Sequence, residues 1–260
     1  MTRLDAEMVR RELARSRQHA TELISRGVVT VAGRPAKKSS MSVTEDTELL
    51  VEGGQEYASR AGHKLAGALT HFTGLSVRGR TCLDAGASHG GFTDVLLQAG
   101  ARQVHAVDVG SNQLVPRLRE DSRVRVLDRT NVRTLTPEQL GGTVDLTVAD
   151  VSFISLTLVL EALAACTDPD GDIVPMVKPQ FEVGKSRLGS AGVVRSPALR
   201  AGSIMQVAKA AHELGWGTRA VIPSGLPGPS GNVEFFLWLR RDAPALARVD
   251  AEQAVKEAAQ

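Results

Sequence analysis

Apolar and polar residues alternate along the second half of the chain in a pattern that predicts strands separated by helices. Short apolar runs predict seven strands, at residues 81–85, 103–108, 123–127, 144–150, 172–177, 217–224 and 232–241. Helices are expected at 61–75, 91–99, 112–119, 155–166 and 197–215, and a long polar loop at 179–195. Strands that alternate with helices favour a parallel, doubly wound α/β sheet. The last two runs flank a turn rich in Gly and Pro, so they predict a closing hairpin with one antiparallel strand.

The first 55 residues follow a different pattern, which predicts a small α+β module. Apolar residues recur at helical spacing over 4–13, and Ser16 is placed to cap a second helix that ends at Gly27. Short strands are expected at 28–33 and 42–51. The expected domains are therefore a small one over 1–55, a linker over 56–62, the α/β domain over 63–242 and a tail over 243–260 that is a loose helix or disordered.

Composition is that of an ordinary globular protein, with 42% hydrophobic and 23% charged residues. No apolar run reaches the roughly 18 residues of a membrane span, and the charged start of the chain lacks the apolar core of a signal peptide. We therefore expect a cytoplasmic protein with no membrane partner. Cys82 and Cys166, and likewise His63 and His89, lack the spacing of metal ligands, so no metal is expected.

The net charge is only +2, but the positive charge is concentrated at the start of the chain. Residues 1–40 hold nine Lys and Arg against four Asp and Glu. Such a face is typical of a contact with nucleic acid, and the alternative is a solvated helix face. Aromatic residues make up only 3% of the chain, which argues against a broad base-stacking platform.

A glycine-rich turn follows the first strand of the α/β domain, in the sequence TCLDAGASHGGFTD. The strand ends in an acid, and glycines let the backbone and the start of the next helix approach a ligand closely. The spacing is not the G-x-G-x-x-G of nicotinamide binders, and it suits a nucleoside with an amino-acid tail, S-adenosylmethionine. The alternative is a tight turn with a purely structural role. The candidate cofactor-binding residues of this turn are Asp84, Gly86, Ser88, Gly90, Gly91 and Phe92.

Further polar residues follow the next two strands. Asp108 lies about 20 residues after the turn, the spacing expected of an acid that binds ribose hydroxyls. Asp128 and Asn131 follow the third strand and are candidates for binding the adenine edge. Single acids at strand ends are often only caps or turn formers, but a succession of them after a glycine turn favours a cofactor site. Asp150 is a further candidate for binding this cofactor.

Two acids and two lysines are predicted to meet at the same edge of the sheet. Asp150 and Lys178 end neighbouring strands, and Glu234 lies at the start of the last strand. Lys64, in the helix before the first strand, can fold over this edge. The set is interpreted as a catalytic Lys-Asp-Lys-Glu tetrad, with a buried ion-pair network as the alternative.

Two resemblances cover almost the whole chain. The segment RLDAEMVRRELARSRQHATELISRGVVTVAGRPAKKSS resembles the RNA-binding S4 domain, in which basic residues of the second helix and the following loop contact RNA. The motifs SRAGHKL, DAGASHGGFTD, VADVSFIS, MVKPQFEVG and NVEFFLWL resemble the TlyA family, long known as haemolysins, whose catalytic domain is similar to the FtsJ-type ribose 2′-O-methyltransferases. The RNA-binding residues that the first resemblance implies are Arg15, Arg17, Arg26, Arg34, Lys37 and Lys38.

The second resemblance implies a Rossmann-like methyltransferase with a seven-stranded, mostly parallel sheet. It also implies methyl transfer from S-adenosylmethionine to the ribose 2′-OH of cytidines in ribosomal RNA, with the tetrad at Lys64, Asp150, Lys178 and Glu234. The long start of the chain resembles members that modify both 16S and 23S rRNA.

A role for each tetrad residue follows from the chemistry of a hydroxyl nucleophile. A ribose 2′-OH is a poor acid, so its oxygen must be oriented or its proton removed. We expect Lys178 to be the base or the orienting group, Lys64 to help position it, and the two acids to hold the amines.

Residues around the tetrad are expected to hold the RNA. Lys185, Arg187 and Arg195, in the loop after Lys178, are expected to contact RNA phosphates. Phe153 either supports a flipped nucleotide or packs at a helix start, and packing is preferred. The expected partners are ribosomal RNA or ribosomal subunits, and the protein is expected to be a monomer.

Three other functions remain open at this point. A non-catalytic RNA-binding factor for ribosome assembly would keep the first domain, and the tetrad argues against it. A pseudouridine synthase would need a largely mixed-sheet domain. A pore-forming haemolysin would need a membrane span or a long amphipathic hairpin, and the sequence indicates neither.

Overall fold

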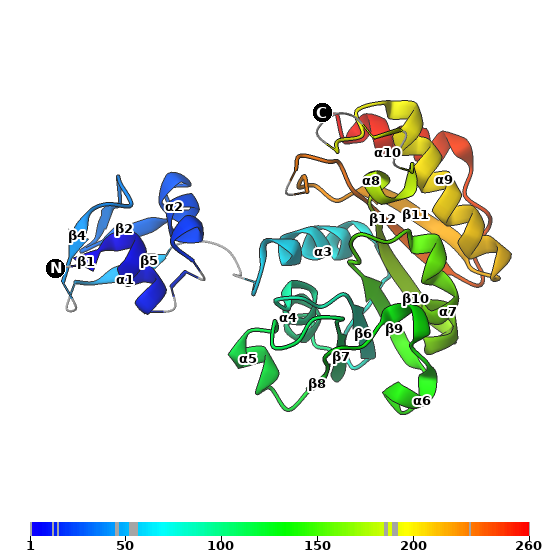
Figure 1. Ribbon diagram of the computed structural model, residues 1–260, viewed down its shortest axis with the longest axis horizontal. Helices are drawn as coiled ribbons and strands as arrows, with labels where there is room; N and C mark the ends of the chain where they lie inside the picture. The colour runs from blue at the N-terminus through cyan, green and yellow to red at the C-terminus, as the bar shows by residue number, and fades with distance from the viewer. Residues whose placement is uncertain are drawn as a thin grey trace. The chain divides into compact units, whose positions relative to one another are not determined.

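The computed structural model describes residues 2–11, 13–14, 16–44, 47–51, 57–184, 187–188, 192–228 and 230–259. The chain divides into two compact units, Met1–Glu56 and Tyr57–Gln260, each described here by itself (Figure 1).

The first unit packs two helices on short strands, as the sequence predicts. Its helices are α1 (Leu4–Arg10) and α2 (Arg17–Ser25), and its strands are β1 (Thr2–Arg3), β2 (Val29–Val31), β3 (Arg34–Pro35), β4 (Ser42–Val43) and β5 (Leu49–Val51). The hydroxyl of Ser16 caps α2 by accepting the backbone N–H of His19 at 3.1 Å. Leu4, Met8 and Leu23 lie in the small core between these elements.

The strand predicted over 42–51 is wrong, because two strands occupy this range. Strand β4 pairs with β1 in a two-stranded sheet, whereas β5 pairs with β2 in a three-stranded sheet. Between the two strands, the N–H of Thr44 donates to the hydroxyl of Thr47 at 2.9 Å.

The second unit is built on a seven-stranded sheet with the order β11-β12-β10-β9-β6-β7-β8. Its strands are β6 (Thr81–Ala85), β7 (Gln103–Val107), β8 (Val124–Leu127), β9 (Val144–Ala149), β10 (Thr167–Val177), β11 (Gly217–Pro223) and β12 (Phe235–Arg240). Strand β12 lies between β10 and β11 and is antiparallel to both. The pairs formed by β10, β9, β6, β7 and β8 are parallel. The predicted sheet, with one antiparallel strand in the closing hairpin, is confirmed.

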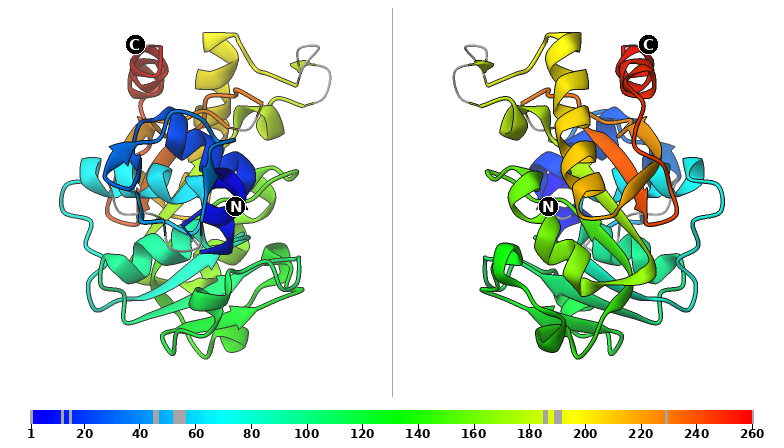
Figure 2. Two further views of the ribbon diagram at one scale, coloured as in Figure 1. Left: turned by 90° about the vertical axis from the view of Figure 1, so that its left-hand side faces the viewer. Right: turned by 90° about the vertical axis from the view of Figure 1, so that its right-hand side faces the viewer.

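Helices cover both faces of this sheet and enclose two hydrophobic cores (Figures 1 and 2). The helical elements are α3 (Arg60–His71), α4 (Gly91–Gln98), α5 (Pro116–Arg119), η1 (Val132–Thr134), α6 (Pro137–Leu140), η2 (Leu156–Leu158), α7 (Leu160–Cys166), α8 (Pro179–Glu182), α9 (Pro197–Glu213) and α10 (Arg248–Glu257). Helices α3, α4 and α5 contribute to one core, and α6, α7, α9 and α10 to the other. Because side chains alternate along a strand, Cys82 of β6 faces the first core and Leu83 the second.

Two segments are more ordered than the sequence suggests. The expected loose tail forms α10, which lies beside α9 and buries Ala251, Ala254 and Val255 in the core (Figure 2). Residues expected to belong to the linker pack on the second unit, since the N–H of Ala58 donates to the buried carboxylate of Asp94 at 2.7 Å.

Candidate active site and family

The candidate site lies at the carboxyl end of the parallel strands. Asp84 lies near the end of β6, and Asp108 directly follows β7. Asp150 follows β9, and Lys178 follows β10. In a parallel sheet these ends share one edge, which is where open α/β folds bind their ligands. The parallel pairing therefore explains why Asp84 and Lys178, far apart in the sequence, lie at the same edge of the sheet.

The glycine turn between β6 and α4 has the backbone that only glycine adopts easily. Gly86 has φ of +91°, and a Cβ at this position would lie 2.7 Å from the backbone oxygen of Asp150. Gly90 has φ of +95° and begins α4. Because Gly86 has no side chain, its backbone can lie directly against the loop that carries Asp150.

A cavity of about 370 Å³ opens in front of this turn. Five predicted cofactor residues line it, namely Gly86, Ser88, Asp108, Asn131 and Asp150. The carboxylate of Asp108 accepts the N–H groups of Ser88 at 2.9 Å and Gly110 at 2.7 Å, which fixes its position at the rim. Val109, which was not predicted from the sequence, lines the same cavity and is 67% exposed.

The other five predicted cofactor residues do not line this cavity. Phe92 is buried with its ring centroid 5.9 Å from that of Phe236. Gly90 and Gly91 form the start of α4. Asp128 forms an ion pair with Arg119 at 2.8 Å, and the hydrogen bond that this guanidinium donates lowers the pKa of the carboxyl.

Asp84 is fully buried beneath the glycine turn. Its Oδ2 accepts the hydroxyl of Thr93 at 2.7 Å, while its Oδ1 has no hydrogen-bond partner within the described ranges. Burial raises its pKa to about 7, the hydrogen bond from Thr93 opposes this rise, and the negative charge of Asp150 adds to it. A buried carboxyl with a free oxygen has unused capacity to bind a cation or a donor.

The predicted tetrad forms two ion pairs. Lys64 Nζ lies 2.5 Å from Glu234 Oε2, and Lys178 Nζ lies 2.6 Å from Asp150 Oδ1. Lys64, Lys178 and Glu234 are all less than 10% exposed. A further hydrogen bond that the sequence did not indicate joins Gln180 Nε2 to Glu234 Oε1 at 3.3 Å.

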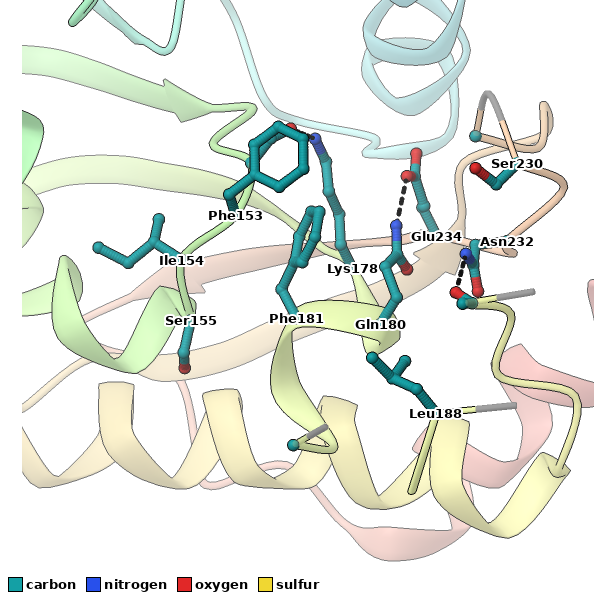
Figure 3. Close-up of a pocket in the computed structure, with 14 residues that line it drawn as sticks. Phe153, Ile154, Ser155, Lys178, Gln180, Phe181, Leu188, Ser230, Asn232 and Glu234 are labelled. Carbon is teal, nitrogen blue, oxygen red and sulfur yellow. Dashed lines mark hydrogen bonds between the residues drawn. The ribbon is translucent and has the colours of Figure 1, made fainter. Parts of the chain in front are cut away.

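A second cavity, of about 550 Å³, lies next to the lysine of the second pair. Lys178, Gln180 and Glu234 line it together, as Figure 3 shows. The segment Ser152–Ile154 lines both this cavity and the cavity of the glycine turn. The two cavities therefore adjoin, and the Asp150–Lys178 pair stands between them because each partner lines one of them.

An exposed aromatic ring stands over the second cavity. Phe153 is 92% exposed, has φ of +64° and lies 5.3 Å from the ring of Phe181, centroid to centroid (Figure 3). The preferred expectation, that Phe153 packs at a helix start, is therefore wrong. Its loop is held by buried Glu182, which accepts the hydroxyl of Ser155 at 2.5 Å and the N–H of Leu156 at 2.8 Å.

The predicted RNA-binding residues are mostly exposed. Arg26, Arg34, Lys37, Lys38, Arg187 and Arg195 are exposed, and Arg17 is exposed while forming an ion pair with Asp5 at 3.0 Å. Arg15 and Lys185 lie outside the described residues. Their proposed role in binding RNA stays a prediction.

Two features are absent from the described part of the chain. No cluster of three or more His, Cys, Asp or Glu side chains there is arranged to hold a metal ion. Nor does that part contain a helix that is long and apolar enough to span a bilayer.

Two family models match the chain, one within each of its two compact units. Residues 2–49 match the S4 domain, and residues 57–241 match the FtsJ-like methyltransferase family.

Individual relatives match over almost the full length. The 16S/23S rRNA (cytidine-2′-O)-methyltransferase TlyA of Mycobacterium tuberculosis is 58% identical over 98% of this chain and 96% of its own. A Bacillus subtilis protein, YqxC, described as a possible rRNA methyltransferase, is 40% identical over 91% of this chain and 85% of its own. A solved Streptococcus thermophilus structure, described as a possible hemolysin, is 37% identical with a TM-score of 0.78, and covers 99% of this chain and 95% of that one. The chain therefore belongs to the TlyA family of methyltransferases and carries an S4 domain followed by an FtsJ-like methyltransferase domain.

Proposed function

We propose that the protein transfers a methyl group from S-adenosylmethionine to the ribose 2′-OH of cytidines in 16S and 23S ribosomal RNA. The observation that carries this proposal is the pair of adjoining cavities with the Asp150–Lys178 ion pair between them. A methyl donor and a large acceptor have to meet in this way, each in its own cavity and with reactive atoms at the junction. The name of the 58% identical relative supports the choice of rRNA and cytidine.

The residues around the first cavity fit S-adenosylmethionine. Gly86 leaves room for the backbone to approach the ligand, since a Cβ there would collide with the loop of Asp150. The buried Asp84, with an unpartnered oxygen, is suited to the positive charge of the methionine part. Asp108 would hold the ribose hydroxyls, and Asn131 and Val109 would surround the adenine. When bound, S-adenosylmethionine supplies an electrophilic methyl carbon on a sulfonium.

The residues at the junction would act on the acceptor hydroxyl. Lys178 Nζ would orient the 2′-oxygen or take up its proton. The nitrogen of Lys178, or water, would take up the hydroxyl proton when the 2′-oxygen accepts the methyl group that bound S-adenosylmethionine would supply. Asp150 fixes the position of Lys178, and Phe153, exposed above the second cavity, would stack against a nucleotide turned out of its helix.

The first unit would hold the rRNA. Its S4 match and the exposed side chains of Arg26, Arg34, Lys37 and Lys38 support phosphate contacts. Arg187 and Arg195 would add contacts close to the target nucleotide. A ribosomal RNA substrate would place this activity in the cytoplasm.

Replacement of Asp108 by Asn is expected to weaken binding of S-adenosylmethionine about 10- to 100-fold, because hydrogen bonds to a carboxylate contribute about 1.5–3 kcal/mol. Asp128→Asn is the matched control, since this carboxylate also accepts a backbone N–H but does not line the cavity. Isothermal titration of both variants makes the comparison. Equal binding by Asp108→Asn and wild type would contradict the assignment of the first cavity.

A further inference from the structure

Lys178 forms a hydrogen bond in addition to its ion pair with Asp150. Its Nζ donates to Ser152 Oγ at 2.7 Å and lies 2.6 Å from Asp150 Oδ1. Both partners lie in the segment that follows β9, two residues apart, and Ser152 lines both cavities. No role was predicted for Ser152 from the sequence.

Two contacts together fix the position of this nitrogen. The contact with Asp150 is an ion pair, whereas the contact with Ser152 Oγ is a directional hydrogen bond. Rotation about the side-chain bonds of Lys178 would break one of these contacts, so Nζ is held in one place. Because Lys178 lines the second cavity, a further position on Nζ is available to an acceptor there.

The hydroxyl of Ser152 contributes little to the packing of the protein. Ser152 is exposed, whereas Lys178 is only 8% exposed. The loop of Ser152 is anchored independently of this hydroxyl, by the bonds from Ser155 and Leu156 to Glu182. Loss of the hydroxyl should therefore leave the loop and the fold in place.

We propose that Ser152 is a positioning residue, whose hydroxyl holds Lys178 Nζ in the place from which it contacts the ribose 2′-oxygen. This inference rests on the proposed function. It predicts an effect on the chemical step alone, because the hydroxyl acts through Lys178 and a displacement of a reacting group by a fraction of an ångström is enough to slow a reaction.

The test compares Ser152→Ala and Ser152→Thr with the wild type, using methyl transfer from S-adenosylmethionine to unmodified ribosomal subunits. Ser152→Ala should lower kcat about tenfold, with KM for both substrates and the melting temperature unchanged. Ser152→Thr keeps the hydroxyl and has room for its methyl group at this exposed position, so it should restore most of kcat.

Three results would overturn the inference while leaving the proposed function intact. These are a wild-type kcat for Ser152→Ala, a change confined to KM, and a loss of kcat that Ser152→Thr does not recover although the variant is folded. Absence of methyl transfer by the wild type in the same assay would instead overturn the proposed function, and this inference with it.

Discussion

Replacement of Lys178 by Ala is expected to lower kcat by a factor of about 10²–10⁴, the usual contribution of a positioned acid, base or orienting group. Binding of S-adenosylmethionine and rRNA should persist, because Lys178 is one of many groups at the two cavities. The side chain of its partner Asp150 is 18% exposed, so the freed carboxylate can be hydrated and the fold should be retained. Single-turnover methyl transfer at saturating substrate measures the effect.

Lys209→Ala is the control for this prediction. Lys209 lies on α9 with 77% of its side chain exposed, so its loss should leave kcat unchanged. A Lys178→Ala variant that keeps near wild-type turnover with both substrates bound would show that another group activates the hydroxyl.

Replacement of Lys64 by Ala should lower stability as well as methyl transfer, in contrast to the other lysine of the tetrad. The side chains of Lys64 and Glu234 are only 7% and 2% exposed, so loss of the amine leaves a buried carboxylate whose remaining hydrogen-bond donor among the described residues is Gln180. Removing one partner of a buried pair costs about 3 kcal/mol or more. For a unit of this size that corresponds to a melting temperature lower by roughly 6–12 °C, measurable by calorimetry.

The control is a double variant in which both members of the Lys64–Glu234 pair are replaced by uncharged residues. Lys64→Met combined with Glu234→Gln removes both charges at nearly constant volume and should recover most of the lost stability. It should not recover methyl transfer. If Lys64→Ala melts at the wild-type temperature, the short contact between Lys64 and Glu234 does not stabilise the fold.

The architecture of the second unit could be predicted because its signals are local. Each buried parallel strand is a short apolar run, and the acid and glycines of residues 84–91 mark the first turn. The split between β4 and β5 could not be predicted, since one continuous β-compatible segment supplies both and only pairing with β1 and β2 separates them. The packing of helix α10 could not be predicted for a related reason, because its small alanines become a core face only when α9 lies beside them.

The candidate site could be predicted only as far as strand ends define it. The positions of Asp108, Asp150 and Lys178 follow from the topology of the sheet. The contacts of Ser152 with Lys178 and of Gln180 with Glu234 do not, because they depend on how separate loops fold over that edge.

The same limit applies to two other residues. Phe153 looks like a packing residue in sequence, but it has a positive φ and its ring is exposed over the second cavity. Asp128 has the type and position of a ligand-binding acid, and its ion pair with Arg119 is not visible in the sequence pattern.

The central claim is tested most directly by methyl transfer from labelled S-adenosylmethionine to unmodified small and large ribosomal subunits. The labelled nucleotide is mapped by the resistance of its 3′ phosphodiester to alkaline cleavage, which a 2′-O-methyl group confers. The account predicts label on the ribose of cytidine in both 16S and 23S rRNA. Label on a base, or no label on subunits or naked rRNA by protein that binds S-adenosylmethionine, would contradict it.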